Sequence, residues 1–268
     1  GRISDIANHP TNNKIIYIGA AGGGVWKSSD GGASFSPIFD KHIQSIGTVT
    51  FDPNNPDNVL WVGTGETWTR NSVSVGDGIY KSTDGGLNWT NMGLPKSEHI
   101  ASIIVDPRNS NNIWVGVLGA LWGDSEERGI YNSTDGGKTW KKVFQSNRPF
   151  ETTWKVSFPS EKVGYVTIQS YNPDPNVKQQ RVAKTIDGGE TWTEINLIED
   201  AGSREFGVGF IDENHGFVGT MNSGYETKDG GITWNKIDLG RACNKIRIYK
   251  NRNNKVFGYA IGVSLYKF

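Results

Sequence analysis

The sequence predicts an all-β fold built from repeated antiparallel sheets, and three observations support this. An eight-residue pattern, [ST]-x-D-G-G-x-x-[WF], occurs five times at intervals of 42 to 54 residues. A period in this range is typical of repeat architectures. Each copy lies between short runs of β-branched and aromatic residues, and the composition includes 35 glycines and 10 tryptophans. Such runs, separated by turn residues, indicate short strands and not helices.

The Asp-Gly-Gly core of the pattern has the chemistry of a hairpin turn. The aspartate can accept hydrogen bonds from nearby backbone N–H groups, and glycine tolerates positive φ. The aromatic residue that follows is expected to bury its ring between neighbouring sheets. One aspartate per repeat indicates a repeated fold element more than a single catalytic site. We therefore assign a structural role to Asp30, Asp84, Asp135, Asp187 and Asp229.

These stretches resemble the Asp-box, or BNR repeat, of β-propellers, and by spacing the resemblance covers the whole chain. It implies an all-β, six-bladed propeller of four-stranded antiparallel blades, with the last blade short of its outer strand. It also implies that each box joins the third and fourth strands, on the face away from the usual ligand site. Within one predicted domain, 1–268, the blades are 1–41, 42–95, 96–147, 148–199, 200–240 and 241–268.

The elements follow in order from short apolar runs and the turns between them. In blades one to three, turns rich in Pro, Asn and Asp at 9–13, 52–58 and 106–112 separate the first two strands. Blade four has a different turn, 159–162, and blade five is compact. The predicted strands are 3–7, 14–19, 24–28 and 35–39; 46–51, 59–63, 78–81 and 89–92; 113–117, 129–132 and 140–144; 154–158, 164–168 and 181–184; 206–210, 215–219 and 224–227; and 245–249, 256–261 and 263–267.

The two halves of the chain resemble different relatives. Residues 1–144 are similar to sortilin-like bacterial propellers, often labelled glycosyl hydrolase, through 1–7, 63–66 and 76–82. Residues 150–268 resemble propellers of the photosystem II assembly-factor type. This change of resemblance along the chain predicts a seam near 145–150. Such a seam would arise in a chimera, engineered or not, or in an excised fragment. The alternative is ordinary divergence among the blades. The start at Gly1, without an initiator Met or signal peptide, predicts a mature form, a fragment or an engineered product.

Composition excludes several classes of partner and cofactor. Lys+Arg and Asp+Glu are both 28, and this balance argues against nucleic acid. No apolar run approaches the ~18 residues that span a membrane. Cys243 is the only cysteine, so we expect no intrachain disulfide and a small buried side chain. The four histidines lie in different blades, where we expect them to be solvated, so we predict no metal and no cofactor.

Loop length marks the candidate ligand site. In a propeller, the loops joining strands two and three share one face, and three consecutive ones are long here: 64–77, 118–128 and 170–176. Their aromatic side chains could stack on a sugar ring or a peptide, and their charged groups offer directional hydrogen bonds. In the alternative interpretation, the aromatics pack their own loops and Glu66 pairs with Arg70. The candidate ligand-binding residues are Glu66, Trp68, Arg70, Trp122, Asp124, Glu126 and Tyr171.

We predict a non-catalytic binding scaffold, extracytoplasmic or secreted in a bacterium, for a peptide, protein or glycan. The sequence assigns no oligomeric state. The alternative is a glycoside hydrolase that uses Glu66 with Asp124 or Glu126. Two family patterns argue against it. No arginine has the Arg-Ile-Pro setting of sialidases, and 20–24, Ala-Ala-Gly-Gly-Gly, lacks the catalytic Asp of xyloglucanase-type propellers.

Overall fold

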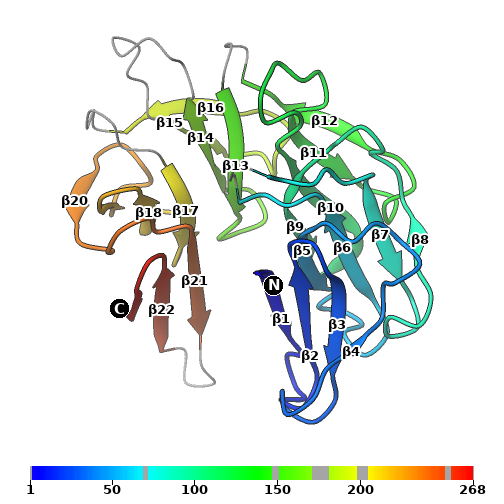
Figure 1. Cartoon of the computed structure of the whole chain (residues 1–268). Coiled ribbons are helices and arrows are strands. Elements are labelled where there is room, and N and C mark those ends of the chain that lie inside the picture. The colour runs from blue at the N-terminus through cyan, green and yellow to red at the C-terminus, as the bar shows by residue number, and fades with distance from the viewer. Residues whose placement is uncertain are drawn as a thin grey trace. The chain divides into compact units, whose positions relative to one another are not determined.

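Every regular element that the structure describes is a β-strand. This computed structural model describes residues 2–68, 72–146, 151–170, 181–197, 205–250 and 255–267 (Figure 1). The chain divides into two compact units, Gly1–Gln145 and Ser146–Phe268. Each unit contains three sheets, which we number as blades 1 to 3 and 4 to 6.

Unit 1 has three four-stranded blades, each a meander of antiparallel strands in chain order. Blade 1 consists of β1 (Ile3–Asn8), β2 (Ile16–Ala20), β3 (Gly24–Ser28) and β4 (Ser36–Pro37). Blade 2 consists of β5 (Ile46–Phe51), β6 (Leu60–Thr64), β7 (Ile79–Ser82) and β8 (Thr90–Asn91). Blade 3 consists of β9 (Ile100–Asp106), β10 (Asn109–Val117), β11 (Gly129–Ser133) and β12 (Lys141–Phe144).

Unit 2 repeats the pattern, but its last blade has three strands. Blade 4 consists of β13 (Glu151–Ser157), β14 (Gly164–Ser170), β15 (Arg181–Thr185) and β16 (Thr193–Asn196). Blade 5 consists of β17 (Glu205–Phe210), β18 (Gly216–Thr220), β19 (Gly224–Thr227) and β20 (Asn235–Ile237). Blade 6 consists of β21 (Lys245–Lys250), β22 (Val256–Ile261) and β23 (Leu265–Lys267). The predicted fold class, a six-bladed β-propeller whose last blade lacks its outer strand, is confirmed.

The outer strands are shorter than the sequence predicts. β4 and β8 have two residues each, and β8 begins after the box aromatic Trp89. The ring of Trp89 instead packs on the core of blades 1 and 2, and its Nε1–H donates to the carbonyl of Ile38 at 3.0 Å. In blade 2 the box aromatic therefore joins neighbouring blades, as expected, but does so from the turn and not from the strand.

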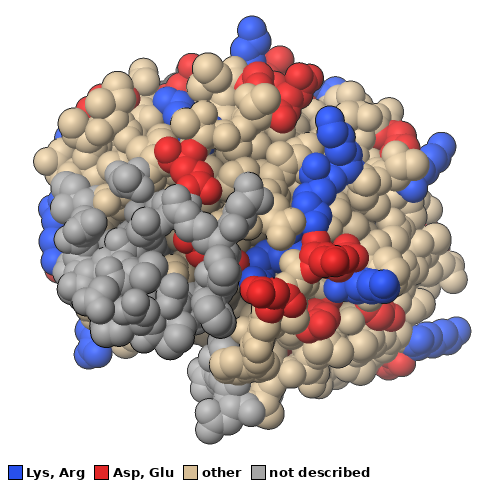
Figure 2. Space-filling view, turned by 90° about the horizontal axis from the view of Figure 1, so that it is seen from above, with Lys and Arg blue, Asp and Glu red and all other residues tan. Residues whose placement is uncertain are grey.

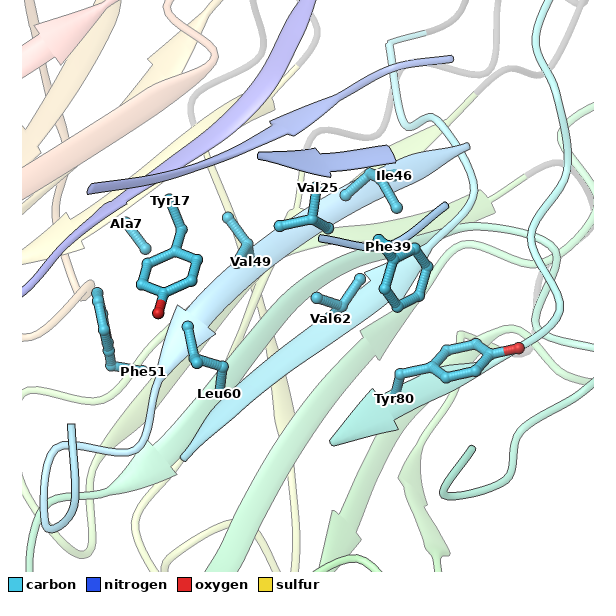
Figure 3. Packing of buried hydrophobic residues seen from close by; sticks show 10 residues of the cluster. All are labelled: Ala7, Tyr17, Val25, Phe39, Ile46, Val49, Phe51, Leu60, Val62 and Tyr80. Atoms are coloured by element: carbon cyan, nitrogen blue, oxygen red, sulfur yellow. The ribbon is translucent and has the colours of Figure 1, made fainter. Parts of the chain in front are cut away.

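Aromatic and branched side chains fill the space between blades 1 and 2 (Figure 3). Tyr17 from β2 and Phe51 from β5 meet edge to face, with ring centroids 5.3 Å apart. Phe39 makes similar contacts with Tyr80 and Trp89. Each buried aromatic removes about 150–250 Å² from water, so these contacts dominate the stability of the joint. In unit 2, Tyr165 and Phe210 stack in parallel, 3.6 Å apart.

The five boxes share one hydrogen-bond pattern. In blade 2, Ser82 Oγ donates to Asp84 Oδ1 at 2.8 Å and accepts the N–H of Gly86. The N–H of Gly85 donates to the carbonyl of Asn58, in the turn between the first two strands of the same blade. The equivalent N–H groups of the other boxes make the same bond, at 2.8 to 3.0 Å, to Lys14, Asn111, Lys162 and Asn214. Each box is therefore fastened to the start of the second strand of its own blade or to the turn before that strand.

Candidate functional site

The candidate site lies on unit 1, where the loops after β6 and β10 leave their strands. The β6–β7 loop is tied to the segment before β9, because the N–H of Gly76 donates to the carbonyl of Glu98 at 2.6 Å. That segment also holds the start of the next loop, since the N–H of Leu118 donates to the carbonyl of His99 at 2.8 Å. The two long loops are thus anchored on one short stretch, 97–99.

Glu66 is a buried carboxylate with a fixed partner. The residue is 3 % exposed, and Arg2 Nε donates to its Oε1 at 2.9 Å, joined there by Arg2 Nη2. The N–H of Glu66 donates to Ser45 Oγ at 2.9 Å. Ser45 Oγ in turn donates to the carbonyl of Ser74 at 2.6 Å. Among the described residues the partner of Glu66 is therefore Arg2, and Arg70 lies outside the described ranges.

His99 is buried next to this ion pair, which corrects the expectation that the histidines are solvated. The residue is 2 % exposed, and burial lowers its pKa to about 4, an effect that a hydrogen bond to the backbone of Glu66 partly offsets. Within the described part of the chain, Nδ1 of His99 has no hydrogen-bond partner. His9, near the other face of blade 1, is also buried; its Nδ1 accepts the N–H of Asn12 at 3.0 Å.

The β10–β11 loop is held by Arg128, which is buried. Its Nε donates to the carbonyl of Leu118 at 2.8 Å, and its Nη2 donates to the carbonyls of Gly123, at 2.9 Å, and Ala120. A guanidinium offers five donors in a rigid fork, so one side chain fixes several backbone positions. The loop therefore presents its tip on a rigid support.

Two candidate tryptophans are accessible on these loops. Trp122, at the tip of the Arg128-held loop, is 80 % exposed, and Trp68 in the β6–β7 loop is 40 % exposed. Asp124 and Glu126 are exposed beside Trp122. An exposed indole offers a flat apolar face and an N–H donor, which suit it to stacking on and hydrogen bonding to a ligand. The structure thus leaves both tryptophans available to a ligand, while Tyr171 lies outside the described residues.

Charge on the face seen in Figure 2 is mixed. Lysine and arginine side chains lie beside aspartate and glutamate, without a large area of one sign over the described residues. Groups of three or more potential metal ligands are absent from the residues that the structure describes. This surface is suited to polar and aromatic contacts more than to a polyanion.

Sequence reasoning identified the loops but not the residues that hold them. Four supporting residues were not predicted: Arg2, Ser45, His99 and Arg128. Each of them lies either far along the chain from the loop that it supports or at the base of that loop. An Arg residue placed just before a strand, like Arg128 before β11, is the one local signal that could have been used.

Comparison with known proteins places this chain in a family. The Sortilin-Vps10 family model, described as sortilin, neurotensin receptor 3, matches residues 77–216, more than half of the chain. The chain belongs to the Sortilin-Vps10 family. In this Sortilin-Vps10 chain, no helix among the described residues is long and apolar enough to cross a membrane.

Relatives support both resemblances drawn from the sequence. Xyloglucanase Xgh74A of Acetivibrio thermocellus is 26 % identical over 225 residues, covering 71 % of this chain and 25 % of the relative. The photosystem II assembly lipoprotein Ycf48 of Prochlorococcus marinus is 40 % identical over 55 residues, 20 % of this chain and 16 % of that protein. The crystal structure of the GH74 enzyme of Niastella koreensis superposes with a TM-score of 0.69 at 22 % identity, over 99 % of this chain and 44 % of that one. The chain spans about a quarter of the length of the xyloglucanases that it matches.

Proposed function

We propose that this chain is a non-catalytic binding module whose loop face in unit 1 takes a peptide, protein or glycan. The observation that carries the proposal is Trp122, a largely exposed indole on a loop that Arg128 pins at three carbonyls. Ligand sites are commonly variable loops on a rigid support, and an aromatic face can stack on a sugar or a peptide group. Trp68, exposed on the neighbouring long loop, supplies a second such face.

The same geometry argues against hydrolysis. A glycosidase requires two carboxyl groups about 5–10 Å apart, one to donate a proton and one to attack or to activate water. Glu66 is buried and its Oε1 is bound by Arg2, whereas Asp124 and Glu126 are exposed to solvent. A buried carboxylate that accepts hydrogen bonds from a guanidinium is not open to a substrate oxygen. We therefore assign Glu66 to positioning the loop.

A glycoside hydrolase is the second candidate, favoured by the relatives named xyloglucanase. It would use Asp124 or Glu126 with Glu66, and its substrate would be a glucan. For either function we propose an extracytoplasmic, bacterial location and no nucleic-acid partner. The balanced charge, with 28 basic and 28 acidic residues, supports the last point.

A glycan and peptide array tests the binding proposal. We expect selective retention of a glycan or a peptide by the wild-type chain, and at least tenfold weaker binding by Trp122→Ala or Trp68→Ala. Leu87→Ala is the control, because Leu87 is 80 % exposed like Trp122 but lies in an Asp-box. Unchanged binding in both tryptophan variants would exclude this site.

Incubation with xyloglucan separates the two functions. The binding proposal expects no new reducing ends above the rate in buffer. Release of reducing ends that Asp124→Asn or Glu126→Gln abolishes, without loss of binding, would instead establish the hydrolase.

A further inference from the structure

We propose that Glu98 is a ligand-binding residue of the loop face and that it selects a peptide with a cationic side chain, lysine or arginine. This role rests on the proposed binding function of unit 1 and specifies the class of its ligand. The backbone at Glu98 is strained, the two long loops are fastened at this point, and the carboxylate has no partner among the described residues.

Glu98 lies at the centre of a strained γ-turn. Its φ is 52°, and the N–H of His99 donates to the carbonyl of Ser97, two residues back, at 2.5 Å. A three-residue turn with a positive central φ is rare, because a left-handed backbone brings the Cβ too close to the next carbonyl. Glycine would adopt this conformation without that cost, yet the sequence has a glutamate here.

Two other non-glycine residues of the described chain have a positive φ, and neither requires a functional explanation. Leu94, with φ 56°, packs its side chain on the core between blades 2 and 3. Ala242, with φ 50°, carries only a methyl group, and its N–H donates to the carbonyl of Met221 at 2.8 Å. The carboxylate of Glu98, in contrast, makes no hydrogen bond or ion pair within the described ranges. A strained residue whose side chain has no partner in the fold points to a function for that side chain.

The γ-turn is the point at which both long loops are held. The carbonyl of Glu98 accepts the N–H of Gly76 at 2.6 Å, and a Cβ added at Gly65 would lie 1.8 Å from the same oxygen. Only glycine therefore lets the β6–β7 loop approach so closely. The next residue, His99, holds the β10–β11 loop through the N–H of Leu118 at 2.8 Å. The side chain of Glu98 is thus carried on a fixed backbone at the junction of the two loops.

The residues on either side of Glu98 also have unused hydrogen-bonding groups. Ser97 and His99 are each 2 % exposed, and Ser97 Oγ and His99 Nδ1 have no partner among the described residues. Buried polar atoms are usually satisfied, often by an ordered water. A polar group that binds at 97–99, directly or through such a water, would satisfy these atoms.

The charges of the anchored segments favour a cationic ligand. Glu98 is half-buried, and Asp124 and Glu126 are exposed on the β10–β11 loop. In the described part of these segments the basic residues are Lys96, which is exposed, and Arg128, which is buried and donates to backbone carbonyls. An ammonium or guanidinium group can pair with a carboxylate and lie over an indole face, and both groups are present here. A neutral sugar could stack on the indole but would leave the charge of Glu98 unpaired.

A peptide array with paired substitutions tests the role of Glu98. Short peptides that contain a lysine or an arginine are printed beside the same peptides with glutamine in its place, and beside xyloglucan oligosaccharides. We expect the wild-type chain to bind the cationic peptides at least tenfold more tightly than the glutamine peptides, and Glu98→Gln to lose this preference. Glu98→Lys should reverse it, in favour of peptides with glutamate. Glu190→Gln is the control, because it removes an exposed glutamate from an Asp-box of unit 2.

Urea unfolding separates a binding role from a structural one. Glu98→Gly removes the carboxylate and the backbone strain together, so it should lose the preference for cationic peptides while its urea midpoint stays at or above that of the wild type. Ala242→Gly makes the same backbone change in unit 2 and should keep the preference. A midpoint that falls in both Glu98→Gly and Glu98→Gln would assign a structural role to Glu98 and overturn the proposal.

The array also separates this role from the binding function on which it rests. Cationic peptides that bind Glu98→Gln and Glu98→Gly as tightly as the wild type would overturn the role of Glu98 alone. Retention of the oligosaccharides in place of the peptides, with loss in Trp122→Ala, would do the same and leave the loop face as a site. A wild-type chain that retains no peptide and no oligosaccharide would overturn both.

Discussion

At the scale of single residues, the box aspartates stand out as acceptors in exposed turns. Asp84 Oδ1 accepts the N–H of Asn88 at 2.9 Å and the hydroxyl of Ser82, and Oδ2 accepts Asn88 Nδ2 at 2.7 Å. These bonds, led by the backbone N–H of Asn88, lower the pKa of Asp84 to about 2. Hydrogen bonds lower the pKa of Asp135 and Asp229 to about 2 in the same way. The turns are therefore stabilised by the charged form.

Acid should weaken the protein through these carboxylates. A folded-state pKa below the unfolded value of about 4 means that the unfolded chain binds more protons, so stability falls as pH drops from about 4 to 2. We expect the urea midpoint to fall across this window, and to fall less steeply in Asp84→Asn and Asp135→Asn. Asp40→Asn, at an exposed aspartate outside the boxes, is the control and should keep the wild-type slope.

The burial of His99 predicts a second pH range in which the stability of the protein changes. Burial lowers the pKa of His99 to about 4, so between pH 6.5 and 4 the unfolded chain binds one more proton than the folded chain. The free energy of unfolding therefore decreases as the pH is lowered from 6.5 to 4. The shift corresponds to up to about 3 kcal/mol. Urea unfolding of the wild type and His99→Gln measures it, and the variant should have a flatter profile between pH 6.5 and 4. Equal slopes would show that His99 is accessible to protons in the folded state.

At the scale of elements, one glycine in the second strand sets how closely blades pack. A Cβ added at Gly63 on β6 would lie 2.4 Å from Cγ2 of Ile100, which is fully buried on β9. At Gly116 on β10, the same place in blade 3, the nearest atoms would be 3.9 Å away. Neither glycine has a positive φ, so the two positions differ in packing and not in backbone strain.

Alanine should therefore have opposite effects at these two positions. Gly63→Ala forces a methyl group against Ile100 and should cost about 1–3 kcal/mol of unfolding free energy. Gly116→Ala has room, and should be neutral or stabilise by about 0.4–1 kcal/mol because alanine restricts the unfolded chain. Chemical denaturation of the two variants measures the difference. A similar loss in both would mean that strand flexibility, and not contact with Ile100, explains the glycines.

At the scale of the whole molecule, the charges cancel. The formal net charge is zero and the sequence pI is about 7.1. A protein near its pI lacks the net repulsion that keeps copies apart, so contacts between copies meet little electrostatic opposition. The boundary between the two units, Gly1–Gln145 and Ser146–Phe268, falls near the position where the sequence changes from one family resemblance to the other. Whether the chain is one domain or a chimera stays a prediction.

Solubility should be lowest near neutral pH. We expect the polyethylene glycol concentration that precipitates the chain to pass through a minimum near pH 7, and to rise on either side as net charge develops. Lys267→Glu shifts the net charge by two units and should move the minimum to lower pH. A precipitation curve without a minimum between pH 6 and 8 would show that local contacts outweigh net charge.

The sequence by itself determined the blades, because a repeated turn with fixed chemistry and period-two strands leaves little freedom in local structure. It predicted the five boxes, the number of strands in blade 6, and the two long loops that carry Trp68 and Trp122. Only the tertiary structure decided which side chains meet across the chain, since Arg2 and Glu66 are 64 residues apart and no local pattern joins them. The burial of His99 and the donation by Lys27 to the carbonyl of Gly85 likewise depend on how one blade sits against the next.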